Sequence, residues 1–307
     1  MRNPINYDGV LNSPETVISL SDNPRDINVF LPVRGRLTFL NPCLTYIRES
    51  AESAGMKVNV IVVENDDRPQ YENYCTISGI DYIFIPNSAS CSDGMFAKSL
   101  CYNIGFLKAL RTEWNIFHDL DILVEKDFFS KLKTYLVEES TWVQPYTEKR
   151  VMRLNHLDTH SIIKNPERIR DLGSLGTPSN PGSPGGSIVV KSTDFINIGG
   201  YDPEYFYGYS PEDAFFWAKL EVLHKRIDAV FETHFQGSAV YTDDPAIEVY
   251  HLDHPHAEGS NPKLHLMVNY LTSYYRASYE RKRDFIDRKR DNFLTTITNL
   301  ECGGSNV

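Results

Sequence analysis

Two aspartates, Asp119 and Asp121, are the residues whose type and spacing most directly suggest chemistry. They close an apolar run that begins at Asn115, and apolar residues resume after them as far as Val124. On a strand, alternation would put both carboxylates on one face and their apolar neighbours toward the core. Such a pair costs free energy unless a cation or donor groups occupy the site, and a hard divalent ion bridging a diphosphate would satisfy it. A solvated strand end or turn is the alternative interpretation of this short motif.

Three histidines form a second group with metal-binding chemistry. His251, His254 and His256 lie within six residues and directly follow a predicted strand. Imidazoles are borderline metal ligands, so together with the aspartates they predict a mixed carboxylate and imidazole site of the kind that manganese favours. No cysteine is near them in the sequence, which disfavours a structural zinc centre.

A third group lies in the segment Tyr207–Trp217. Ser210 as N-cap, Pro211 at the first helical position and Asp213 at the third form a capping box, which needs no further function. A carboxylate at a helix start beside tyrosines is also well placed as a general base for a hydroxyl group, and the tyrosine rings could stack on a sugar. The two roles are compatible.

The elements that must position these groups alternate between strands and helices. Apolar runs predict strands at 27–32, 58–63, 80–86 and 114–119, and helical spacing predicts helices at 37–54 and 95–110. This order indicates an α/β sheet with mostly parallel strands, whose carboxyl ends bind ligands. Three of these strand ends carry polar groups, namely Arg34 and Arg36, then Glu64–Arg68, then Asp119 and Asp121.

The second half of the chain continues with a strand at 187–191, helices at 193–198 and 211–224, and strands near Ala229 and at 246–251. The Gly/Pro/Ser-rich segment 171–186 predicts a surface loop, either a linker or a loop that covers a substrate. A helix-rich, Tyr-laden and basic segment follows Pro262.

Composition excludes several classes of protein. The 307 residues are 41% hydrophobic with a formal charge of -10, so we expect a well-packed core and no nucleic-acid partner. We expect no secretory signal in the polar start and no membrane span, because no run of about 18 apolar residues occurs. Five scattered cysteines predict free thiols in the cytoplasm. A membrane anchor removed from the start is the alternative.

Five blocks, in order between residues 27 and 260, resemble the β-1,4-galactosyltransferase family and its bacterial relatives. Leu31–Arg36 resembles the family's Pro-Phe-Arg-Asn-Arg, and Phe96–Gly105 resembles Phe-Asn-Arg-Ala-Lys-Leu-Leu-Asn-Val-Gly. Phe117–Asp121 resembles the metal motif Phe-Ser-Asp-Val-Asp. Gly185–Phe195 with Ile198–Tyr201 resembles Gly-Gly-Val-Ser-Ala-Leu-Ser-Lys-Glu-Gln-Phe and its following Asn-Gly-Phe, and Tyr207–Asp213 resembles Trp-Gly-Trp-Gly-Gly-Glu-Asp. Ordered blocks are more specific than any single one.

The resemblance implies a GT-A fold, which is a Rossmann-like, mixed and mostly parallel sheet flanked by helices. It implies a catalytic domain over 1–261, with a nucleotide-binding half at about 22–125 and an acceptor half at about 185–261, and a helical C-terminal extension over 262–307. The implied activity is that of a metal-dependent, inverting hexosyltransferase in polysaccharide biosynthesis. It would move a hexose or N-acetylhexosamine from a UDP-sugar to a carbohydrate hydroxyl, with Mn²⁺ or Mg²⁺.

The family's site residues carry over by position. Asp121, His251 and His254 become the metal ligands, with Asp119 near the metal or the ribose; a histidine replaces the family's methionine ligand. Asp213 falls on the catalytic base, and Glu212 beside it holds acceptor hydroxyls. Tyr207 and Tyr209 replace tryptophans of the acceptor site. The expected donor contacts, from these motifs and the polar strand ends, are Pro32, Arg34, Arg36, Glu64, Lys98, Asp119, Gly185 and Gly186.

Two finer expectations concern substrates. Ser183 stands where galactosyl-specific members carry a tyrosine that crowds the sugar's 2-position, so UDP-N-acetylhexosamines should be used at least as well as UDP-galactose. The basic segment Arg276–Arg290 could contact an anionic membrane carrying a lipid-linked acceptor. Interleaved acidic residues favour a solvated helix with internal ion pairs instead.

Three other functions are compatible with the same residues. A retaining transferase of the same fold would also use the aspartates and a metal-binding histidine. A sugar-nucleotide-binding protein without turnover is the second alternative, and a metal phosphohydrolase is the third.

Overall fold

The computed structural model describes residues 5–90, 92, 94–138, 140, 142–147, 150–168, 172–179, 184–224, 247–255 and 261–303. Ser183, His256 and the predicted strand near Ala229 lie outside these ranges. Within them, no helix has the length and apolar character needed to cross a membrane.

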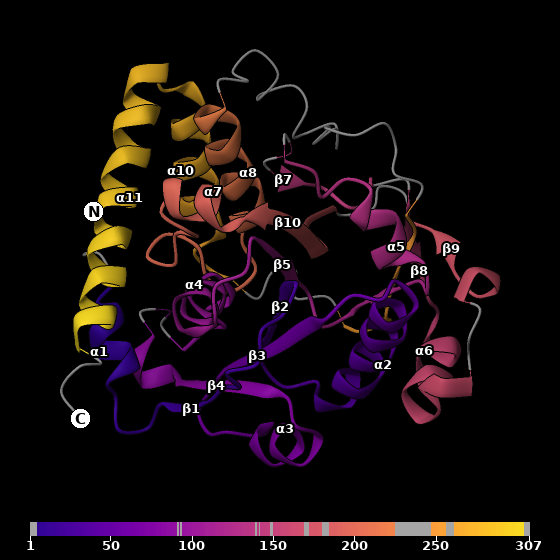
Figure 1. The fold of residues 1–307 in the computed structure, drawn as a ribbon. Helices are drawn as coiled ribbons and strands as arrows, with labels where there is room; N and C mark the ends of the chain where they lie inside the picture. Colours follow the sequence, from indigo (N-terminus) through magenta and orange to yellow (C-terminus); the bar gives the residue numbers. More distant parts are fainter. Residues whose placement is uncertain are drawn as a thin grey trace.

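A seven-stranded sheet forms the centre of the molecule (Figure 1). Its order is β1 (Val17–Ser19), β4 (Asp81–Pro86), β3 (Val58–Asp66), β2 (Ile27–Val33), β5 (Trp114–His118), β10 (Ser187–Lys191) and β7 (Trp142–Val143). Strands β4, β3, β2 and β5 run parallel, whereas β1, β10 and β7 pair antiparallel with their neighbours. The predicted mixed, mostly parallel sheet is confirmed.

Helices cover both faces of this sheet, and the strands are therefore apolar almost throughout. Val29 and Leu31 of β2 belong to one core with α2 (Leu37–Ser53), while Phe30 between them belongs to a second core with α4 (Lys98–Lys108). The second core also contains residues of α7 (Ser192–Asn197), α8 (Glu212–Leu223) and α11 (Tyr279–Gly303). The remaining helices are α1 (Tyr7–Leu11), α3 (Glu72–Ser78), α5 (Phe128–Lys133), α6 (His156–Lys164) and α10 (Leu264–Arg276).

A second sheet of four strands lies beside the first. Its order is β6 (Ile122–Val124), β11 (Val249–His251), β8 (Val151–Arg153) and β9 (Thr177–Pro178). Strand β9 lies in the segment 171–186, which we expected to contain no regular structure; that expectation was wrong, because Thr177 and Pro178 pair with β8. The antiparallel register of β11 on β6 sets His251 opposite Ile122.

The C-terminal helices are packed into the body of the protein. Ile286 and Phe293 of α11 lie in the second core, and Met267 and Leu271 of α10 pack with Phe215 of α8. Figure 1 shows α11, in yellow, running beside α1 and along the layer of α7 and α8. The division at residue 262 stays a prediction, and the helices beyond it share the cores of the preceding chain.

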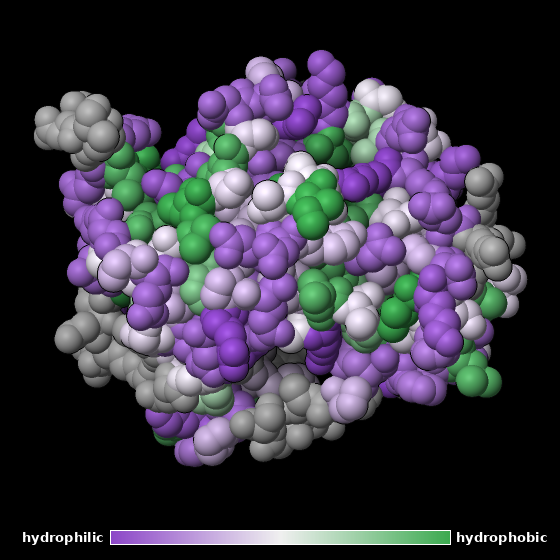
Figure 2. All heavy atoms as spheres, turned by 90° about the horizontal axis from the view of Figure 1, so that it is seen from below, coloured by the Kyte–Doolittle hydropathy of each residue, from purple (hydrophilic) through white to green (hydrophobic). Residues whose placement is uncertain are grey.

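The surface of the protein is mostly polar, as its composition predicts. The face in Figure 2 is mostly hydrophilic, with hydrophobic side chains scattered in small groups.

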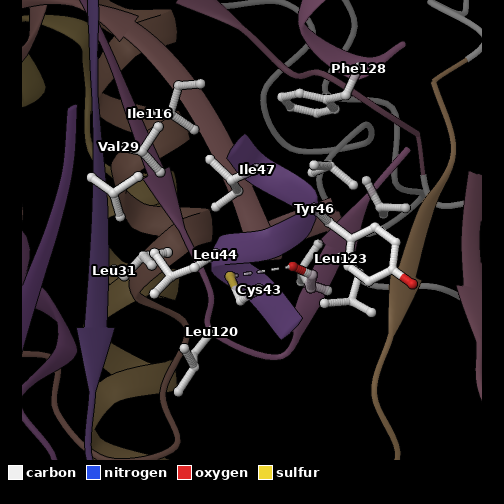
Figure 3. Close-up of a cluster of buried hydrophobic side chains, with 14 of the residues drawn as sticks. Val29, Leu31, Cys43, Leu44, Tyr46, Ile47, Ile116, Leu120, Leu123 and Phe128 are labelled. Atoms are coloured by element: carbon white, nitrogen blue, oxygen red, sulfur yellow. Dashed lines mark hydrogen bonds between the residues drawn. The ribbon is translucent and has the colours of Figure 1, made fainter. Parts of the chain in front are cut away.

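Among the described cysteines, Cys43, Cys75 and Cys101 are buried free thiols and Cys302 is an exposed one. Cys43 points from α2 into the core of Figure 3, where its thiol is 3.9 Å from the carbonyl oxygen of Ile122. This core therefore lies directly beneath the segment that carries Asp121.

Candidate active site

The two aspartates lie in a turn between the two sheets, and their predicted common strand face is wrong. Strand β5 ends at His118 and β6 begins at Ile122, so residues 119–121 form the connection. Leu120 is buried and anchors it. His118 donates from Nε2 to the carbonyl oxygen of Ile122 at 2.9 Å, and burial lowers the pKa of this imidazole to about 4, so the ring stays neutral. Because a turn does not alternate as a strand does, Asp119 and Asp121 face different partners.

Asp121 meets the two predicted histidine ligands. One atom from each of Asp121, His251 and His254 lies within 4.8 Å of the others, and the three side chains are half-buried. The Asp121 Oδ2 atom is 2.9 Å from His254 Nε2. Strand pairing makes this contact, since β11 lies against β6 and the Leu252 amide donates to the Asp121 carbonyl at 2.9 Å. The sheet thus joins residues that are far apart in the sequence.

This donor set fits a divalent ion. Around an ion with bonds of about 2.1 Å, neighbouring ligand atoms lie about 3 Å apart, which is the spacing of Asp121 and His254. Burial opposes ionisation of Asp121, but its hydrogen bond with His254 and the charges of His251 and Arg36 keep its pKa below the ordinary value. One carboxylate and two imidazoles suit manganese and similar metals.

Arg36 reaches the same carboxylate from the end of β2. Its Nη1 donates to Asp121 Oδ2 at 2.8 Å. Gly35 and Arg36 both have positive φ, 59° and 54°, and Arg36 is the single non-glycine residue with this conformation in the described ranges. A left-handed conformation costs about 1–2 kcal/mol outside glycine, and such strain persists where the surroundings hold it. Arg34 instead donates to the Gly94 carbonyl at 2.8 Å.

A second charged group surrounds Lys98, at the start of α4. Its ammonium lies 2.8 Å from Asp119, 3.2 Å from Glu212 and 3.4 Å from Asp213, and its side chain is 13% exposed. Tyr102, one turn along α4, donates to Asp119 at 3.1 Å. Asp119 therefore belongs to this group. The described contacts do not support the prediction that Asp119 is also a metal ligand.

Asp213 is held at the start of α8 without serving as a cap. The helix begins at Glu212, and the Ser210 hydroxyl donates to the Glu212 carboxylate at 2.8 Å, so the predicted capping box was wrong. Carboxylates in the first turn are favoured by the helix dipole. Burial raises the pKa of Asp213 well above its ordinary value, although Lys98 opposes this; Glu212 and Asp119 add to the rise.

Gly185 and Gly186 lie between the residues around Asp121 and the charged group around Lys98. A Cβ on Gly185 would lie 2.5 Å from Asp213 Oδ2, and one on Gly186 would lie 2.7 Å from Ile122, the residue after Asp121. The Gly186 carbonyl accepts from the Asp119 amide at 2.8 Å. Side chains at these two positions would displace the residues that flank them, so the site depends on glycine here.

Three residues of the predicted contacts are buried in this structure. The Glu64 carboxylate is buried and accepts hydrogen bonds from the Gln70 and Tyr71 amides and the Tyr82 hydroxyl, so it shapes the loop after β3. Pro32 is buried within β2. Tyr207 is 3% exposed and packs in a core with residues of α8 and α10, whereas Tyr209 is 46% exposed.

Sequence reasoning missed three residues of this site. His118 closes the turn, Tyr102 holds Asp119, and Tyr146 lies beside Gly186. His118 and Tyr102 lie inside the recognised blocks, so their neighbourhood was a signal. Tyr146 belongs to no motif, and its place depends on the pairing of β7 with β10.

Comparisons with known proteins give distant similarities. No family model and no curated protein matches the chain. A mutant β-1,4-galactosyltransferase 7 from Drosophila, in complex with manganese, UDP-Gal and xylobiose, is 14% identical, with a TM-score of 0.43 over 75% of this chain and 72% of that one. Glucosyl-3-phosphoglycerate synthase from Mycobacterium tuberculosis, with Mn²⁺, UDP-glucose and phosphoglyceric acid, is 15% identical, with a TM-score of 0.43 over 81% and 79%. These similarities are too distant to assign a function to this chain.

Proposed function

We propose that this protein is a metal-dependent glycosyltransferase of the GT-A type. It would transfer a hexose or N-acetylhexosamine from a UDP-sugar to a hydroxyl of a carbohydrate acceptor, with inversion at the anomeric carbon. The observation that carries the proposal is the position of two sets of residues on either side of Gly185 and Gly186. One is the metal-ligand set, Asp121, His251 and His254. The other is the partly buried group of carboxylates around Lys98, which includes Asp213. A nucleotide-sugar transferase needs these two functions side by side, one for the leaving diphosphate and one for the attacking hydroxyl.

The metal-ligand set would hold Mn²⁺ or Mg²⁺, which when bound supplies positive charge that stabilises the leaving diphosphate. Arg36, already 2.8 Å from Asp121, adds a fixed positive charge at the same place. We assign Arg36 and Arg34 to the nucleotide phosphates, because both lie in the segment that follows β2. Lys98 is enclosed by carboxylates, so its role is to orient Asp119 and Asp213.

Asp213 is the proposed general base. It accepts the proton of the acceptor hydroxyl while that oxygen attacks the sugar from the side opposite the diphosphate. A carboxyl whose pKa is raised by burial is a stronger base than an ordinary aspartate, and Lys98 at 3.4 Å keeps it oriented. Glu212 would hold acceptor hydroxyls, and the exposed Tyr209 offers a ring on which an acceptor sugar can stack.

The donor sugar is proposed from Ser183, which lies outside the described residues. A serine in place of a tyrosine leaves room for an acetamido group, so UDP-N-acetylhexosamines should be used at least as well as UDP-galactose. A donor competition with one acceptor, comparing UDP-GalNAc, UDP-GlcNAc, UDP-galactose and UDP-glucose, tests this. Exclusive use of an unsubstituted hexose, unchanged in Ser183→Tyr, would disprove it.

A thermal-shift screen of UDP-, GDP- and CDP-sugars, with and without manganese, tests the function as a whole. A ligand at a hundred times its Kd stabilises the folded state by about 2.7 kcal/mol, so a manganese-dependent rise in Tm with UDP-sugars is expected. Transfer to an acceptor panel, with the anomeric configuration of the product read by NMR, completes the test.

Each alternative has its own outcome. A retained configuration identifies a retaining transferase. Binding without transfer to any acceptor identifies a binding protein. Consumption of UDP-sugar that is as fast without an acceptor as with one identifies a phosphohydrolase. No shift with any sugar nucleotide would refute the proposal.

A further inference from the structure

Tyr146 carries a buried hydroxyl that the proposed function has not used. It follows β7, its side chain is 0% exposed, and its Oη has no hydrogen-bond partner in the described part of the chain. Burial of a hydroxyl without a partner costs free energy, and folded proteins leave few such groups. Burial, with Asp119 adding to it, raises the pKa of this phenol well above its ordinary value, so the group keeps its proton and acts as a donor.

The hydroxyl lies at the junction of the two charged groups. A Cβ on Gly186 would come 2.9 Å from Tyr146 Oη, just as one on Gly185 would come 2.5 Å from Asp213 Oδ2. The two oxygens therefore border adjacent residues of the same glycine pair. The charges of Asp119, Asp213, Lys98 and Asp121 act on the phenol. Asp121 belongs to the metal-ligand set, and the other three belong to the group around Lys98.

The nearby protein acceptors already have partners. Asp119 is bound by Lys98 and Tyr102, and Asp121 by Arg36 and His254. A ligand that enters the site would bring the missing acceptor. In an in-line displacement the transferred sugar lies between the leaving diphosphate, here at Asp121, and the attacking hydroxyl, here at Asp213. Gly185 and Gly186 lie between Asp121 and Asp213, and the Tyr146 hydroxyl lies beside Gly186.

We propose that Tyr146 donates a hydrogen bond from Oη to an oxygen of the transferred sugar ring or of its substituent, and so helps to select the donor sugar. This inference rests on the proposed function. It assigns to the sugar a contact that comes from the segment after β7, outside every block on which the family resemblance is built.

The test compares two ligands and two variants. Calorimetry with manganese measures Kd for UDP and for the UDP-sugar that the wild type binds most tightly, on the full chain. In Tyr146→Phe we expect about fivefold weaker binding of the UDP-sugar, the loss of one neutral hydrogen bond, and unchanged binding of UDP. The Tm without ligand should stay equal or rise, because a buried polar group without a partner is removed.

Tyr274→Phe is the matched control. Tyr274 also has a buried hydroxyl without a partner among the described residues, but it packs against Phe215 and Phe285 in the core beneath α10. This variant should bind both ligands as the wild type does. Equal weakening of UDP and UDP-sugar in Tyr146→Phe, or no weakening of either, would overturn the inference while leaving the transferase proposal intact. A wild type that binds UDP but no UDP-sugar would overturn both.

Discussion

At the scale of single residues, Asp121 is the most informative position. Its carboxylate joins His254 and Arg36 at 2.9 and 2.8 Å, so Asp121→Ala removes the centre of the proposed metal site. We expect manganese-dependent binding of UDP-sugar to be lost, with the fold kept because Asp121 lies in a turn. Calorimetry with and without manganese measures this.

Asp253→Ala provides the control for Asp121→Ala. Asp253 is next to His254 in sequence, but its side chain is 47% exposed and contacts His156 at 3.6 Å. Its loss should leave manganese-dependent binding unchanged. Normal turnover of Asp121→Ala in saturating manganese would show that the metal assignment is wrong.

Asp213→Asn tests the base. An amide cannot accept the proton, so turnover should fall by about a hundredfold or more while donor binding is kept. Because burial raises the pKa of Asp213 and the base works in its ionised form, wild-type turnover should rise with pH at values above the ordinary aspartate range. The variant should lose this rise. Unchanged turnover with a lower Tm would instead assign Asp213 a structural role.

Residue types predicted much of the site, and contacts decided the rest. Residue chemistry predicted a mixed carboxylate and imidazole site, the family resemblance implied Asp121, His251 and His254 as its ligands, and these three residues do meet. Tyr207 was expected at an acceptor, but a tyrosine in an aromatic segment can equally be core, and it is 3% exposed. Tyr146 could not be predicted as a site residue, because it belongs to no motif and its position depends on strand pairing.

At the scale of elements, apolar runs located the central strands and their helices to within a few residues. The pairing of β11 with β6 could not be predicted from the sequence, because strand partners depend on the path of the whole chain. The sequence also left open whether residues 119–121 continue a strand or form a turn. An apolar run on both sides of the aspartates is the same whether one strand continues or two strands meet at a turn.

Buried ion pairs tie the C-terminal helix to the segment that leads to Asp213. Lys219 of α8 lies 2.5 Å from Asp202, and Lys289 of α11 lies 2.9 Å from the same carboxylate. Lys219 and Asp202 have 0% exposed side chains. Lys219 also donates to the Ile198 and Gly200 carbonyls, which fixes the connection between α7 and α8.

Lys219→Met should therefore lower the free energy of unfolding by about 3–5 kcal/mol, because the buried Asp202 loses one of its two lysine partners and the Ile198 and Gly200 carbonyls lose their donor. The matched control is Lys131→Met. Lys131 pairs with Asp127 at 2.9 Å on the surface, with 33% and 53% exposed side chains, and such pairs contribute at most about 1 kcal/mol. Urea unfolding of both variants measures the difference, and equal effects would show that the buried network does not stabilise this connection.

At the scale of the whole molecule, the distribution of charge decides whether the basic segment can serve a membrane. The chain carries a formal charge of -10. Within α11, Lys289 is bound to Asp202 and Glu204, and Arg283 and Arg290 both contact Asp287. Lys282 is 6% exposed, with its ammonium 5.9 Å from the centre of the Tyr274 ring. Much of the basic charge is thus neutralised within the protein.

Attraction to an anionic surface is worth about 1 kcal/mol for each basic side chain near it, and ion-paired or buried side chains contribute little of this. We therefore expect no co-sedimentation with vesicles of phosphatidylcholine and phosphatidylserine in equal parts, even at low salt, where surface electrostatics is strongest. The comparison is an Arg281→Ala/Arg288→Ala variant, which changes two basic side chains of α11 that are not among those bound to Asp202, Glu204 or Asp287. Sedimentation of the wild type that this variant loses would establish a membrane contact through α11 and would make a lipid-linked acceptor the first substrate to examine.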